Sequence, residues 1–119
     1  MNTEELINKL NATPETVNFN EVIETIEADY TYKPARFTNG NGDNAAVNEA
    51  GTNEGSCKIF AFAQLNNLSV EQTLHCFGDY YRDDVLNNPE GTDHANIRNF
   101  MKTGWQGILF ETQALIKKD

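Results

Sequence analysis

The sequence has few basic residues and no long apolar run, and each shortage excludes a class of protein. No run of about 18 apolar residues occurs in the 119 residues, so no helix that spans a membrane is predicted. Lys plus Arg total 9 against 18 Asp plus Glu, which gives a formal net charge of −9. Because binding to phosphates relies on clustered Lys and Arg, we expect neither nucleic acid nor a membrane surface as a partner.

Cysteine and histidine are equally scarce. Two cysteines, Cys57 and Cys76, in a chain whose N-terminus does not resemble a secretory signal, predict free thiols in a reducing compartment rather than a disulfide. Two histidines and no Cys/His cluster make a zinc site improbable. The sequence therefore predicts no metal and no cofactor.

The apolar spacing that is present predicts a mainly helical single domain over residues 1–119. The segment Ser56–Leu68 is apolar on nearly every side, which predicts a central helix surrounded by other elements. Ser69 and Gln72 have the spacing of a capping box, and this box predicts the start of a long helix that reaches Val85. Further helices are predicted from Thr3, from Phe19 to Ala28, and from Thr92 or Asp93 to Gly104, with an additional start signal at Thr13-Pro14-Glu15.

Two segments have strand character, Tyr30–Thr38 and Gly107–Ile116, and we expect them to pair with each other. Pro34 restricts the first of them to an edge or a bent strand. The fold class predicted is α+β, mainly helical, with a small two-stranded antiparallel element. Residues 38–54 contain five Asn and three Gly and are predicted to form a long loop, a feature that in a compact domain is usually functional or disordered.

Two similar motifs, Gly51-Thr52-Asn53 and Gly91-Thr92-Asp93, precede predicted helices. Each marks a helix N-terminus whose amides could hold a carboxylate, a phosphate or another anion. The alternative is that the Thr, Asn and Asp side chains cap their own helices. If the two ends meet beside the Asn-rich loop they form one recess, for which the candidate ligand-binding residues are Thr52, Asn53, Ser56, Thr92, Asp93, His94 and Arg98.

A catalytic alternative uses Cys57 and His94. Cys57 lies near the start of the central helix, where the helix dipole favours the thiolate, and His94 could act as its base. Backbone amides near Asn53 and Ser56 would then stabilise an oxyanion. Cys57 also belongs to the apolar row of its helix, which favours a buried structural cysteine instead.

Four stretches of this sequence carry a family resemblance. GTNEGSCKIFAFAQLNNLS (51–69) and FGDYYRDDVLNNPEGTDHANIRNFMKTGW (77–105) closely resemble the HopJ type III effector family of Gram-negative bacteria, and FTNG (37–40) and GILFETQAL (107–115) are similar to it as well. The resemblance implies a protein that a type III secretion system delivers into a plant cell. It implies no catalytic residue, cofactor or substrate.

From the residues and the resemblance together we expect a small acidic binding or interaction module of the bacterial cytoplasm. Its partner would be an unidentified protein or small molecule. The alternatives are a cysteine-dependent hydrolase or transferase that uses Cys57 and His94, and an effector that acts inside a host cell through protein–protein contacts.

Overall fold

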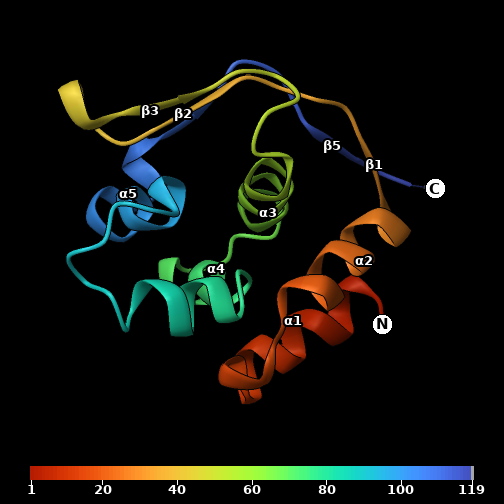
Figure 1. Ribbon diagram of the computed structural model, residues 1–119. Coiled ribbons are helices and arrows are strands. Elements are labelled where there is room, and N and C mark those ends of the chain that lie inside the picture. Colours follow the sequence, from red (N-terminus) through yellow and green to blue (C-terminus); the bar gives the residue numbers. More distant parts are fainter. Residues whose placement is uncertain (119) are drawn as a thin grey trace.

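Groups of helices and groups of short strands follow one another along residues 1–118, which are the residues that the computed structural model describes (Figure 1). The α-helices of this part of the chain are α1 (Thr3–Ala12), α2 (Phe19–Asp29), α3 (Glu54–Leu65), α4 (Val70–His75) and α5 (Ala95–Thr103). A π-helical segment occupies Tyr80–Val85, and short 3-10 segments occupy Pro14–Thr16, Gly42–Asn44 and Gly104–Gly107. The strands are β1 (Tyr30–Tyr32), β2 (Phe37–Asn39), β3 (Ala46–Asn48), β4 (Ile108–Phe110) and β5 (Leu115–Lys117). The α+β class, mainly helical, is confirmed.

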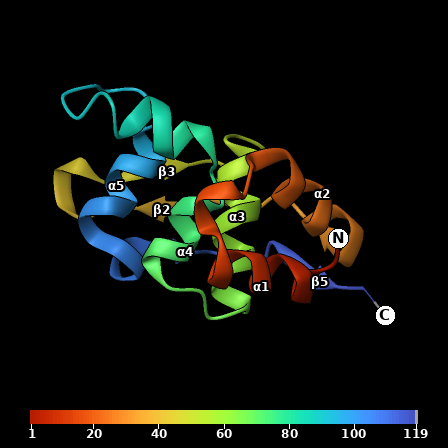
Figure 2. The same cartoon turned by 90° about the horizontal axis from the view of Figure 1, so that it is seen from below.

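The helix α3 is central, as its apolar residues on all sides predict. Figures 1 and 2 show it with α1 and α2 on one side and α5 on the other. Phe60 of α3 is fully buried, and its ring packs against the rings of Phe37, Phe77, Phe100 and Trp105. One aromatic cluster therefore connects β2, α3, α5 and the segment after α4.

The strands form two small antiparallel sheets, where a single two-stranded element was expected. In one sheet β1 pairs with β5, and in the other β2 lies between β3 and β4. The predicted pairing of residues 30–38 with 107–116 is confirmed, but it is divided in two around Pro34, which has no amide to donate. The third strand of the second sheet, β3, was missed because it comes from the Asn- and Gly-rich stretch, whose composition is unfavourable for strands.

The predicted helix starts at Thr3 and Phe19 are confirmed, but the signals that cap these helices were misassigned. Asn2, rather than Thr3, caps α1 in a capping box with Glu5, while the Thr3 hydroxyl donates to Asp29 over 2.6 Å. The signal at Thr13-Pro14-Glu15 produces only the 3-10 turn Pro14–Thr16, and Asn18 caps α2. In both places the cap is an Asn that directly precedes the helix, rather than the predicted Thr.

The predicted long helix after Ser69 is interrupted. Its capping box with Gln72 is confirmed, but α4 ends at His75. Gly78 then takes a φ of 60°, and a Cβ at this position would lie 2.7 Å from the backbone nitrogen of Phe19. The chain therefore turns at Gly78 and approaches the start of α2 closely before it continues as the π-helical segment.

Candidate functional site

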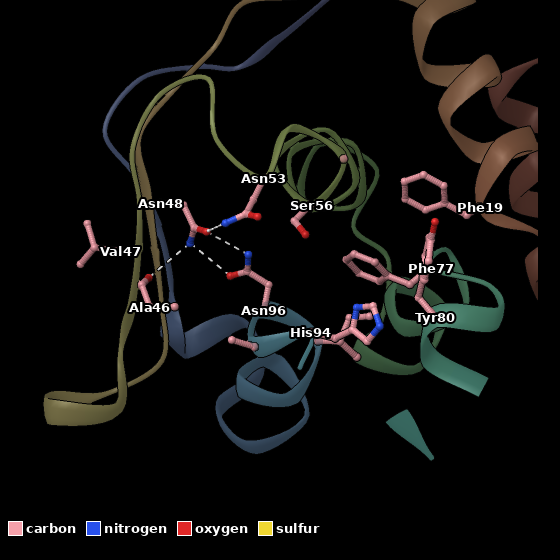
Figure 3. Close-up of a pocket in the computed structure, with 13 residues that line it drawn as sticks. Phe19, Ala46, Val47, Asn48, Asn53, Ser56, Phe77, Tyr80, His94 and Asn96 are labelled. Atoms are coloured by element: carbon pink, nitrogen blue, oxygen red, sulfur yellow. Dashed lines mark hydrogen bonds between the residues drawn. The ribbon is translucent and has the colours of Figure 1, made fainter. Parts of the chain in front are cut away.

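The two predicted helix N-termini meet at one cavity of about 490 Å³, which we call the junction pocket (Figure 3). The starts of α3 and α5 line it from two sides, and β3 closes a third side. Phe19, at the start of α2, completes the wall together with Phe77 and Tyr80. Segments that are far apart in the sequence thus form a single recess beside the Asn-rich stretch.

Both helix ends at this pocket lack a side-chain cap. The N-cap residues Asn53 and His94 have left-handed backbones, with φ of 47° and 53°, and neither side chain accepts a hydrogen bond from its helix. Among the hydrogen bonds of residues 1–118, none uses the backbone N–H groups of residues 54–56 or 95–97 as donors. The helices α1, α2 and α4, in contrast, each have a complete capping box. The free N–H groups of α3 and α5 and the positive ends of their dipoles therefore remain available to a ligand.

A network of asparagine amides forms the polar wall of the pocket. Asn48 accepts hydrogen bonds from Asn53 over 2.7 Å and from Asn96 over 2.9 Å, and donates to Asn96 over 3.1 Å. Asn39 also donates to the side chain of Asn96, over 3.1 Å. Because Asn39, Asn48 and Asn96 are buried, these bonds fix β2 and β3 against the start of α5.

The opposite wall is aromatic. The Phe19 and Tyr80 rings meet edge to face with centroids 5.1 Å apart, and Tyr80 lies 5.4 Å from the His94 ring. Gly55 makes room for this wall, since a Cβ there would lie 2.8 Å from Cζ of Phe19. His94 is held in place by Asp84, whose Oδ2 is 3.1 Å from Nε2. Ser56 has no side-chain hydrogen bond within the described residues, and its hydroxyl points toward the space between the two walls (Figure 3).

Three of the predicted ligand-binding residues line the pocket, namely Asn53, Ser56 and His94. The other four do not. Thr52 donates to the backbone oxygen of Glu49 over 2.7 Å, and Thr92 is exposed. Asp93 and Arg98 form an ion pair of 2.7 Å outside the pocket. The predicted caps Thr92 and Asp93 are wrong, because α5 begins after His94 and both residues lie in the loop before it.

Cys57 is buried in the core rather than placed in the pocket. It is 1 % exposed, and its Sγ contacts the backbone oxygen of Ala35 over 3.7 Å. Burial raises the pKa of the Cys57 thiol, which opposes the lowering expected from the helix dipole. The geometry therefore favours the structural interpretation of this cysteine, and it gives the pairing with His94 no support.

Sequence reasoning missed most of the remaining lining. Asn48 and Asn96 were not predicted as pocket residues. The excess of Asn in residues 38–54 was a signal that could have indicated Asn48. Phe19 and Phe77 lie on apolar stripes that also suit core packing. Only the turn at Gly78 brings Tyr80 beside Phe19, and no local pattern reveals that contact.

Within residues 1–118, no group of three or more His, Cys, Asp or Glu side chains is placed to hold a metal ion. In the same part of the chain, no helix has the length and apolar character needed to cross a bilayer.

Fold and pocket together define a small α+β protein with a partly aromatic recess at two helix ends, lined by no Lys, Arg, Asp or Glu side chain. The chain belongs to the HopJ family: the family model described as HopJ type III effector protein matches residues 3–115. It is also similar to a solved structure titled "Crystal structure of unknown function protein VPA0580", at 52% sequence identity and a TM-score of 0.94, with 99% of this chain and 95% of the other covered. Comparison with curated proteins gives no match.

Proposed function

We propose that this HopJ protein is a non-catalytic binding module that holds a small ligand in the junction pocket. The ligand would carry a carboxylate and a flat apolar body. The observation that supports this proposal is the convergence of two uncapped helix N-termini on one cavity.

The chemistry of the two walls defines the ligand class. Each helix end contributes the equivalent of about half a positive charge and several free N–H donors, which suits a carboxylate. No Lys or Arg lines the pocket, so a single negative charge is better matched than the double charge of a phosphate. The Phe19 and Tyr80 rings offer a surface for the apolar body.

A thermal-shift series tests the proposal, with benzoate, phenylacetate and indole-3-acetate as carboxylates. The matching primary amides and inorganic phosphate serve as comparisons. Saturation at a hundredfold excess over Kd stabilises a protein by about 2.7 kcal/mol, which raises the melting temperature measurably. The carboxylates should stabilise the protein more than their amides do. Equal shifts with acids and amides, or a flat response, would contradict the proposal.

A pair of variants assigns the effect to the pocket. Ala95→Asp places a carboxylate at the start of α5 and should compete with the ligand, so that the shift is lost. Ala12→Asp adds the same charge at the far end of α1, outside the pocket lining, and should leave the ligand-induced shift unchanged.

Family membership also supports secretion and delivery into a host cell, because the matching family is described as type III effectors. A translocation reporter fused after β3 tests delivery independently of the pocket. Export that depends on a functional secretion system supports delivery, and no export from a competent strain contradicts it.

A further inference from the structure

A second cavity lies on the other side of α5, between the loop that precedes this helix and the helix itself. Its volume is about 200 Å³, and its lining includes Leu86, Pro89, Arg98, Met101 and Lys102. It shares no lining residue with the junction pocket. We call it the loop groove.

The loop groove exposes apolar side chains. Leu86, the residue directly after the π-helical segment, is 47 % exposed, and Met101 of α5 is 42 % exposed. Met adapts to irregular partners and is common on binding surfaces. A cavity of this size with such walls accommodates a single apolar side chain.

The groove carries one unpaired positive charge on a negatively charged molecule. Lys102 lines it and no acidic residue does, whereas the charge of Arg98, the other basic residue in the lining, is balanced by the Asp93 carboxylate at 2.7 Å, and the whole chain has a net charge of −9. Lys102 takes part in no ion pair among the described residues, so its ammonium group is available to a partner. The groove therefore complements an acidic group.

Arg98 fixes the wall of the groove. Its guanidinium donates to the backbone oxygens of Asn88 and Asp93 over 2.9 and 2.6 Å, and to the Asp93 carboxylate over 2.7 Å. Gly91 allows the loop to lie this close, because a Cβ there would be 2.6 Å from Nη2 of Arg98. The groove is thus formed before a partner arrives, which lowers the entropic cost of docking.

We infer that the loop groove docks a short acidic peptide segment of a partner protein. One apolar side chain of the segment would enter between Leu86 and Met101, and a flanking carboxylate would pair with Lys102. This docking surface is separate from the junction pocket, so the two proposals can fail independently.

Three blocked pentapeptides test the inference by NMR titration of the full chain: Glu-Asp-Leu-Glu-Asp, Glu-Asp-Gly-Glu-Asp and Lys-Lys-Leu-Lys-Lys. The first should give saturable shifts at the backbone amides of residues 85–88, 90–91 and 98–102, and the other two should not. Equal binding by the glycine peptide would show charge attraction alone, and equal binding by the basic peptide would show apolar contact alone. Either result, or the absence of saturable shifts at these amides, would overturn the inference.

Substitutions at exposed positions test where the peptide binds without disturbing the fold. Lys102→Glu should weaken binding of the acidic leucine peptide about fivefold, and Leu86→Gln should weaken it about tenfold. Lys33→Glu makes the same charge change at an exposed residue outside the groove and should leave the affinity unchanged. An equal loss in Lys33→Glu and Lys102→Glu would contradict a local contact at Lys102.

Discussion

The buried carboxamides of Asn39, Asn48 and Asn96 connect the paired strands β2 and β3 with the start of α5, which is distant in the sequence. A buried amide is favourable only while its donors and acceptors have partners, and each lost partner costs about 1–3 kcal/mol. Asn96 occupies the central position, since its Oδ1 accepts from both Asn39 and Asn48 and its Nδ2 donates to Asn48. The shape of the junction pocket therefore depends on this residue.

Asn96→Ala should lower the free energy of unfolding by about 3 kcal/mol, because Asn39 and Asn48 both lose a buried partner. Urea denaturation measures the change. Asn87→Ala, at an exposed position, should alter stability by less than about 0.5 kcal/mol. Equal stability of the Asn96 variant and the wild type would show that the network contributes nothing.

The thiol of Cys57 should react slowly in the folded protein. It is buried and its pKa is raised by that burial, so little thiolate reaches solvent. Alkylation by iodoacetamide near neutral pH, followed by mass spectrometry, should become rapid only after denaturation. Fast alkylation of Cys57 in the native protein at about pH 6 would instead restore the catalytic alternative.

His75 should make stability depend on pH. Burial, followed by the charge of Arg82 with its Nη1 3.1 Å from Nδ1, holds the pKa of His75 below 6.5 in the folded protein. The unfolded chain therefore binds the proton more readily as the pH falls below about 6.5. Stability is fully present above that pH and is lost as the pH falls through the folded-state pKa. Urea denaturation of wild type and His75→Gln between about pH 7.5 and 5 should show a steeper loss in the wild type. Parallel pH profiles would contradict this contribution.

Among the helices, α5 buries apolar side chains in the core but has no side-chain cap at its N-terminus. Ile97 and Phe100 are buried, yet the first turn contains no acidic residue and has no side-chain cap. Tertiary packing rather than capping holds this end in place. Because the first backbone N–H groups of α5 stay free at the junction pocket, this helix is less stable than it would be with a side-chain cap.

Ala95→Asp should therefore stabilise the unliganded protein, by about 0.3–1 kcal/mol, because a carboxylate at the first helical position interacts with the dipole and the free N–H groups. Ala12→Asp puts the same group at the C-terminal end of α1, where the sign is reversed, and should destabilise the protein. Thermal and urea denaturation of both variants measure the difference. A destabilised Ala95 variant would mean that this helix end is not free.

The sequence allowed prediction of the elements whose signals are local. The apolar character of α3 and the Ser69 capping box need only nearby residues, and the pairing of the two strand regions followed because they were the only strand candidates; the structure confirms all three. The meeting of the two helix starts was the condition on which the predicted recess depended, and the repeated motifs identified which ends to compare. What failed depended on backbone conformation or distant contacts: the left-handed His94 that moved the start of α5, the turn at Gly78, and the strand β3.

At the scale of the whole molecule, excess negative charge opposes folding. The dimensions are 40 × 31 × 20 Å, so at about 0.01 M salt, where the Debye length is about 30 Å, most of the acidic groups repel one another across the molecule. The attractive pairs, such as Lys9–Glu21 and Lys58–Glu27, are few against a net charge of −9. Raising the salt concentration therefore removes more repulsion than attraction.

Sodium chloride should thus raise the free energy of unfolding between about 0.01 and 0.15 M, where the Debye length shortens to about 8 Å. Urea denaturation at each concentration measures the effect, since urea adds no ions of its own. Lys33→Glu makes the net charge more negative at an exposed position and should increase the salt dependence. If salt lowered the stability instead, attractive ion pairs would outweigh the repulsion, and each pair would contribute more than an exposed pair normally does.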